Sequence, residues 1–167
     1  MKIEKFRYLA GVIAAHPNRE LVARTRLQKT VWLLQRKGMP TDYGYMTHFY
    51  GPYSEGIQAD IGLLESFGLI SETLDRTSEG APYYTLTAKP ECKLDELAPF
   101  QVLIDVMANQ STTILELAAT YDAFRVQGDS HDEAVARVKR KKGAKCDDGR
   151  LERAFKLLEK LELPVNS

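Results

Sequence analysis

Arg125 and His131 have the residue types and the spacing that come closest to a catalytic pair in this chain. An arginine can stabilise phosphate charge and a histidine can transfer a proton, and together they would serve metal-independent cleavage of RNA. The intervening residues 128–130 (Gly-Asp-Ser) are typical of a helix break, so the two side chains need not converge. The other histidines, His16 and His48, fall in other predicted segments. We therefore expect no catalytic residue and no enzyme activity, with an Arg-x5-His ribonuclease as a remote alternative.

The sequence contains no residue pattern typical of a metal or cofactor site. Cys92 and Cys146 lie far apart and have no other Cys or His nearby at the spacing of metal ligands. They are typical of free thiols in a reducing compartment. The chain also lacks a Gly-Lys-Ser/Thr phosphate loop, a GxGxxG motif, an HExxH motif and a nucleophile elbow. We expect no bound metal and no cofactor.

Two groups of basic residues are candidates for contacts with nucleic-acid phosphates. The first follows one side of a predicted helix near residues 25–38, and the second is the densest basic run in the chain. The candidate nucleic-acid-binding residues are Arg26, Lys29, Arg36, Lys37, Lys139, Arg140, Lys141, Lys142 and Lys145. The alternatives are an ordinary solvated helix face for the first group and, for the second, cations that favour the C-terminal end of a helix.

A helix predicted over residues 54–67 is acidic and follows a group of aromatic residues. It contains no Lys or Arg, and Gln58 is its only candidate for reading a base, so carboxylates would face the phosphates of any DNA. A protein contact is the alternative use of this surface. The candidate partner-binding residues are Tyr50, Gly51, Pro52, Tyr53 and Glu55. The aromatic residues could instead complete the core where a strand meets a helix.

Residues 60–87 predict the order helix, strand, turn, strand, which is typical of the second half of a winged helix. The helix ends at Phe67-Gly68, the turn contains Gly80 and Pro82, and residues 83–87 form the returning strand. A short apolar piece at residues 21–23 could pair beside this wing. Ile57, Ile61 and Leu64 should share one core with Leu27, Val31 and Leu34.

The remaining elements are predicted to be mostly helical. One helix precedes His16-Pro17, and residues 43–50 read as an irregular strand or extended loop that Gly51-Pro52 breaks. Beyond Pro90 we expect helices over residues 94–108, 113–127, a stretch after Ser130, and 148–163. Helix starts are predicted from capping boxes at Thr25 with Gln28, Thr113 with Glu116 and Ser130 with Glu133, and Ser54 is a predicted N-cap.

Bulk composition limits the class of protein. The 167 residues fit one domain, or a small domain with an extension. The 23 basic residues equal the 23 acidic ones, so a nucleic-acid site would have to be a local patch. The N-terminal residues carry charges among apolar ones and do not form a signal peptide or a membrane span. We expect a cytoplasmic protein with no membrane contact.

Three segments carry a resemblance to known proteins: residues 27–34 (LQKTVWLL), 49–54 (FYGPYS) and 63–70 (LLESFGLI). They resemble the YwgA-like bacterial proteins and, more distantly, the Panacea (SocA-like) antitoxin domain, which shares an "LQK" helix and a "YGP" turn. Residues 115–120 and 151–161 also look YwgA-like, so the resemblance covers most of the chain. The shared motifs are structural. The distant resemblance implies an antitoxin or a defence-associated regulator.

These observations predict a mostly α (α+β) protein. A winged helix-turn-helix domain with a two-stranded wing should occupy residues 1–90, and residues 91–167 should form a helical extension that packs on the same core or dimerises. The expected function is a non-enzymatic winged-helix binding module, namely a nucleic-acid-binding or regulatory protein of bacterial or phage type. The alternative is a protein-binding adaptor or antitoxin-like partner. The partner is therefore DNA or a protein, and a homodimer is an open alternative.

Overall fold

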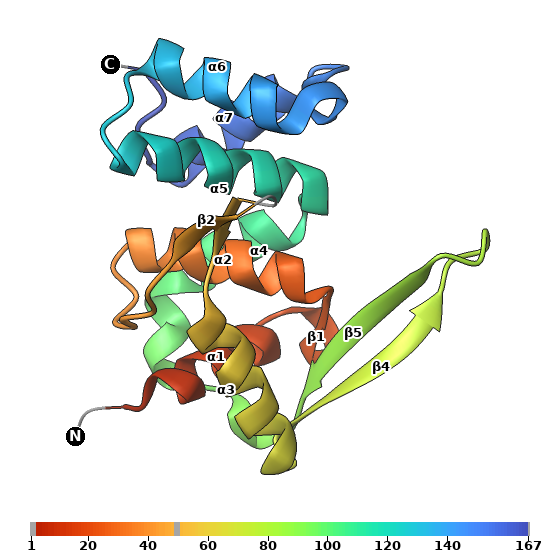
Figure 1. Cartoon of the computed structure of the whole chain (residues 1–167). Coiled ribbons are helices and arrows are strands. Elements are labelled where there is room, and N and C mark those ends of the chain that lie inside the picture. The colour runs from red at the N-terminus through yellow and green to blue at the C-terminus, as the bar shows by residue number, and fades with distance from the viewer. Residues whose placement is uncertain (1–2, 49–50, 167) are drawn as a thin grey trace.

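The computed structural model describes residues 3–48 and 51–166, and this part of the chain is mostly helical with two small antiparallel sheets (Figure 1). The α-helices are α1 (Lys5–Ala14), α2 (Arg24–Arg36), α3 (Glu55–Ser66), α4 (Gln101–Ala108), α5 (Thr112–Val126), α6 (His131–Lys142) and α7 (Arg150–Lys160). The strands are β1 (Glu20–Val22), β2 (Met46–His48), β3 (Gly51–Tyr53), β4 (Ile70–Arg76) and β5 (Pro82–Ala88). Short 3₁₀ segments are η1 (Pro17–Arg19), η2 (Pro90–Cys92), η3 (Asp95–Phe100) and η4 (Gly143–Cys146).

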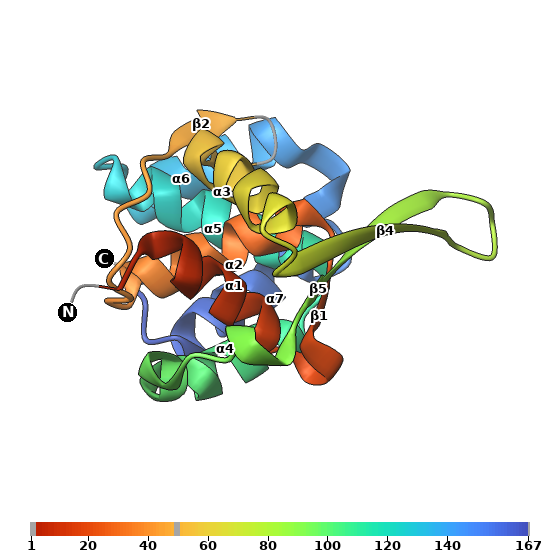
Figure 2. The same cartoon turned by 90° about the horizontal axis from the view of Figure 1, so that it is seen from below.

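The larger sheet has the strand order β1-β5-β4. β4 and β5 form the predicted hairpin, in register from Ile70 opposite Ala88 to Arg76 opposite Pro82. The predicted short strand is present as β1, which pairs with β5 and places Leu21 opposite Leu86. The hairpin extends well beyond the helical body (Figures 1 and 2). Its root is therefore in the core, whereas its far half is in solvent.

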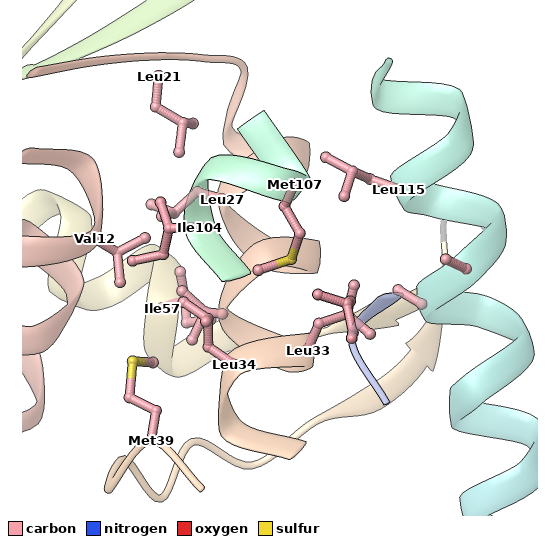
Figure 3. Close-up of a cluster of buried hydrophobic side chains, with 14 of the residues drawn as sticks. Val12, Leu21, Leu27, Leu33, Leu34, Met39, Ile57, Ile104, Met107 and Leu115 are labelled. Carbon is pink, nitrogen blue, oxygen red and sulfur yellow. The ribbon is translucent and has the colours of Figure 1, made fainter. Parts of the chain in front are cut away.

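The predicted shared core is confirmed. Ile57, Ile61 and Leu64 of α3 are fully buried in one cluster with Leu27, Val31 and Leu34 of α2. Their spacing of three and four residues places them on one side of each helix. Figure 3 shows residues of α2 and α3 beside Ile104, Met107 and Leu115. This cluster therefore contains residues from both the 1–90 and the 91–167 parts of the chain.

α5 lies at the centre of the C-terminal part. Eleven of its residues are buried, and it packs against α2 and β3 on one side and against α6 and α7 on the other. The helix predicted over residues 94–108 is divided, because Pro99 lies in the 3₁₀ segment η3 and the α-helix begins only at Gln101. None of the helices in the described part of the chain combines the length and the apolar character needed to cross a membrane.

Two predicted helix caps are present. The Ser54 hydroxyl accepts a hydrogen bond from the main-chain N–H of Ile57, and Ser130 with Glu133 forms a complete capping box. The box at Thr25 is wrong, because α2 begins at Arg24 after Ala23, which has no side-chain cap.

The box at Thr113 is also wrong, because the N-cap of α5 is Ser111, two residues earlier, and its hydroxyl accepts a hydrogen bond from the main-chain N–H of Ile114. In both failed cases the residue expected at the third helical position has another partner. Gln28 exchanges hydrogen bonds with the main chain of Ser54, and Glu116 is in a buried ion pair.

Gly51-Pro52 was expected to break a strand, and this is wrong, since these residues begin β3. β3 pairs with β2 and packs against α5. Gly51 has a φ of 92°, and a Cβ at this position would collide with the Thr120 hydroxyl of α5. A glycine therefore allows the hairpin to lie directly on α5. The predicted Phe49 and Tyr50 contacts lie outside the described residues.

Candidate binding surface

Lys29 of α2 is not a surface residue. It is 1% exposed, and its ammonium donates a hydrogen bond of 2.8 Å to the main-chain carbonyl of Pro52. Burial lowers the pKa of Lys29 to about 8, because the charged form loses hydration. The prediction that Lys29 contacts phosphate is therefore wrong for this conformation. The residue instead ties α2 to the β2–β3 hairpin.

Other basic residues of α2 also serve internal contacts. Arg26 donates to the carbonyl oxygens of Met107 and Gln110 at the end of α4, and burial lowers the pKa of its guanidinium. Arg36 donates to Asp122 of α5 at 2.9 Å. Asp122 is 1% exposed, so this ion pair neutralises a buried carboxylate.

Lys37 makes a long contact of 3.4 Å with the Glu162 carbonyl. The predicted basic stripe along α2 is therefore mostly engaged within the fold.

The basic residues at the end of α6 lie on different sides of the helix, so some are exposed and one is buried. Lys139, Arg140 and Lys141 are exposed. Lys142 points inward and forms an ion pair of 2.7 Å with Glu116, in which both side chains are almost fully buried.

Lys145 also contacts Glu116, at 3.1 Å. Burial lowers the pKa of Lys142 more than the carboxylate raises it. Lys142 is therefore removed from the predicted nucleic-acid surface, and three exposed cations remain in the last turn of α6.

Arg125 and His131 do meet, although a helix break separates them in the sequence. Both donate to the main-chain carbonyl of Val165, Arg125 at 3.0 Å and His131 at 2.6 Å. The Tyr121 hydroxyl contacts the same carbonyl and both side chains. The site where a ribonuclease would place a substrate phosphate therefore holds the chain's own C-terminal segment. Within the described residues, no cluster of His, Cys, Asp and Glu could hold a metal ion.

α3 presents a surface that is poor in hydrogen-bond donors. Its exposed residues are Glu55, Ala59, Gly62, Leu63 and Ser66, and the C-cap residue Phe67 is also exposed. Gln58 is half-buried, and its side-chain oxygen accepts a hydrogen bond from Arg24. Because Arg, Lys, Asn and Gln make most direct base contacts, this face lacks the groups that read a major groove.

Arg24 occupies the centre of a groove at the start of α2. Its guanidinium donates to both carboxylate oxygens of Glu72 on β4, at 2.7 and 2.9 Å, and also contacts Gln58 and Glu65 of α3. The hydrogen bond to Glu72 raises the pKa of Arg24 above its ordinary value. Arg24 thereby fixes the N-terminus of α2 against both α3 and the hairpin.

Two hollows meet at Arg24, and together they form what we term the Arg24 groove. One, of about 420 Å³, lies toward β2 and β3, and the other, of about 530 Å³, lies toward the β4–β5 hairpin. The lining residues are Ala23, Arg24, Thr25, Gln28, Lys29, Met46, Tyr53, Glu55, Gln58, Glu72, Pro82, Tyr83 and Tyr84. A lining of apolar and aromatic side chains with a few polar groups is typical of a binding site.

The predicted partner-binding residues are divided by the fold. Gly51 and Pro52 are buried against α2 and α5, so the proposal of a surface contact is wrong for them. Tyr53 is half-buried and Glu55 is exposed, and both line the Arg24 groove. Tyr50 lies outside the described residues. Sequence reasoning missed Arg24 and Glu72, which are 48 residues apart and carry no local signal of their pairing.

The surface formed by α3 and the hairpin is acidic. Residues 54–88, which form α3 and the hairpin, contain six carboxylates and one arginine. Glu55, Asp75 and Glu79 are exposed and form no ion pair with any described residue. A neutral protein therefore carries a local negative field on this side.

The chain is similar to the Bacillus subtilis (strain 168) protein named "Uncharacterized protein YwgA". The two are 28% identical over 149 residues, covering 86% of this chain and 89% of the relative. The resemblance to YwgA-like proteins is confirmed. No family model matches the chain, and the similarity to the Panacea domain stays a prediction.

Proposed function

We propose that residues 1–90 form a winged helix in which α3 precedes the wing β4–β5. The order α1, β1, α2, α3, β4, β5 and the strand order β1-β5-β4 support this proposal. The β2–β3 hairpin is then an insertion between α2 and α3. In DNA-reading proteins of this kind the helix in the position of α3 enters the major groove. The exposed side chains of α3 argue against that use here.

We infer that the protein is a non-enzymatic, regulatory binding module whose partner is another protein with a basic segment. One observation carries the proposal: the cations of α2 are engaged inside the fold, whereas Glu55 in the groove and Asp75 and Glu79 on the hairpin stay exposed. A basic segment with an apolar side chain would match the exposed Glu55 and the apolar Met46 and Tyr53 of the groove. An antitoxin-like role fits this chemistry, because antitoxin action is partner binding.

The test is retention of a partner from the native source by the full chain. A variant with Glu55→Lys, Asp75→Lys and Glu79→Lys should lose the partner, and binding of its basic segment should weaken with salt. The matched control carries Asp132→Lys, Asp147→Lys and Glu152→Lys, which make the same charge change on exposed residues of the α6–α7 region. A partner retained equally by both variants would contradict the proposal.

Nucleic-acid binding is the second candidate function. It is favoured by the exposed Lys139, Arg140 and Lys141, none of which forms an ion pair with the described residues. This function requires affinity for duplex DNA that falls steeply with salt and drops when the three residues are changed to Gln. The absence of DNA binding at low salt would exclude this function.

A further inference from the structure

The outer edge of β4 has main-chain groups available for pairing. At the two ends of the hairpin, Lys89 donates to the Leu69 carbonyl and Thr77 donates to the Ala81 carbonyl. Hydrogen bonds across an antiparallel pair recur at every second residue, so the odd-numbered residues of β4 face β5. The N–H and C=O groups of Glu72, Leu74 and Arg76 therefore point to the opposite side. No strand in the described part of the chain pairs with that edge.

The side chains at this edge form a pattern that is symmetric about Leu74. Glu72 and Arg76 lie two residues to either side of Leu74 and project from the same face of the sheet. Leu74 is paired with Tyr84 of β5 on that face, and the two are 50% and 48% exposed. An exposed apolar pair flanked by opposite charges on an open edge is a site for strand addition.

We propose that β4 pairs with β4 of a second copy of this chain, antiparallel and centred on Leu74. In this register Leu74 lies opposite Leu74 of the second copy, and Glu72 lies opposite its Arg76, twice by symmetry. Glu72, Leu74 and Arg76 of each copy have their main-chain groups directed outward, so the register satisfies the hydrogen-bonding pattern. The two Leu74 side chains and the two Tyr84 rings then form one apolar cluster. The opposite charges exclude a parallel arrangement, which would align Glu72 with Glu72.

The geometry of the molecule permits this pairing. The hairpin extends beyond the body (Figure 2), so antiparallel pairing places the two bodies at opposite ends of a six-stranded sheet. The tip residue Glu79 of one copy then lies opposite residue 69 of the other. The Lys89 ammonium is close to that point, 3.8 Å from the Cβ position of Gly68. Glu72 already accepts from Arg24, and its carboxylate has lone pairs left for a second guanidinium.

The proposal predicts which cysteine substitutions form disulfides between chains. In a full-length background with Cys92→Ala and Cys146→Ala, Leu74→Cys should cross-link to itself, since paired Cα atoms lie about 5.5 Å apart. Thr73→Cys alone and Asp75→Cys alone should form no disulfide between chains, because each lies roughly 8 Å from its own counterpart. A mixture of Thr73→Cys and Asp75→Cys proteins should cross-link, because these two positions oppose each other.

Sedimentation equilibrium of the wild-type chain should show a dimer whose population rises with protein concentration. Leu74→Pro removes only an outward-facing N–H and is tolerated at a strand edge, so it should fold and be monomeric. Arg76→Glu should raise the dimer dissociation constant roughly tenfold or more, whereas Lys139→Glu, the same charge change on α6, should not. A wild-type chain that stays monomeric up to about 1 mM, or Leu74→Cys cross-linking no faster than Thr73→Cys, would overturn the proposal.

Discussion

Arg24 and Glu72 form a two-pronged hydrogen-bonded pair that joins the first residue of α2 to the third residue of β4. Both nitrogen–oxygen distances are below 3 Å, and the Glu72 side chain is 15% exposed. The pair connects the helical body to the hairpin. Both residues also line the Arg24 groove, so groove shape and hairpin orientation depend on the same contact.

Replacing Arg24 should loosen the hairpin. Arg24→Gln removes a partly exposed bidentate pair, and we expect the free energy of unfolding to fall by about 1 kcal/mol. Amide hydrogen exchange of residues 70–76 should increase. The control Arg140→Gln changes an exposed arginine of α6 and should shift stability by less than about 0.5 kcal/mol in urea unfolding. Equal effects of the two substitutions would contradict the role given to Arg24.

Lys29 should make stability rise with pH in the alkaline range. Its pKa is lowered from 10.5 to about 8 in the folded chain, so between these values the unfolded chain binds more protons. The cost of burying the charge is fully present below pH 8 and is relieved by pH 10.5. It amounts to up to about 3 kcal/mol, on the basis of roughly 1.4 kcal/mol per pH unit.

Urea unfolding of the wild type and of Lys29→Met over pH 7–10.5 measures this dependence. The free energy of unfolding of the wild type should increase with pH relative to that of Lys29→Met. Lys139→Met, at an exposed position, should follow the wild type throughout. A constant difference between the wild type and Lys29→Met would exclude a lowered pKa.

Glu116 should be more important for stability than its single negative charge suggests. Glu116→Gln removes the carboxylate that pairs with the buried Lys142 ammonium, which should cost about 3 kcal/mol. Adding Lys142→Met to the same chain should recover most of this loss, because the buried ammonium is removed as well. Glu152→Gln, on the exposed face of α7, is the matched control. Thermal or urea unfolding of the wild type, Glu116→Gln, Lys142→Met and the double variant gives the coupling energy.

The Arg125–His131 pair should hold the C-terminal segment and perform no chemistry. Arg125→Ala should raise amide hydrogen exchange of residues 163–166, since the Val165 carbonyl loses a donor. Purified wild-type protein should not cleave single-stranded RNA in the presence of a chelator. RNA cleavage that both Arg125→Ala and His131→Ala abolish would establish the ribonuclease alternative instead.

Elements that carry their own local signals were predictable. The hairpin, the two helices α2 and α3 of the shared core and the Ser130 capping box all depend on residues within a few positions of one another. The environment of Lys29 was not predictable, because its partner Pro52 is 23 residues away. α2 is covered by α1, α4, α5 and β3, so the side expected to be solvated is an interior one. The Arg24 groove depends in the same way on a contact across 48 residues.

The division of the hairpin into a buried root and a solvated outer half has an evolutionary consequence. Ile70, Leu86 and Ala88 at the root belong to the core, whereas residues 73–82 are all exposed or nearly so. Mutations in the outer half carry little penalty for folding, so recognition there can change without prior stabilising substitutions. Homologous chains can thus diverge in their binding partners while retaining the same fold.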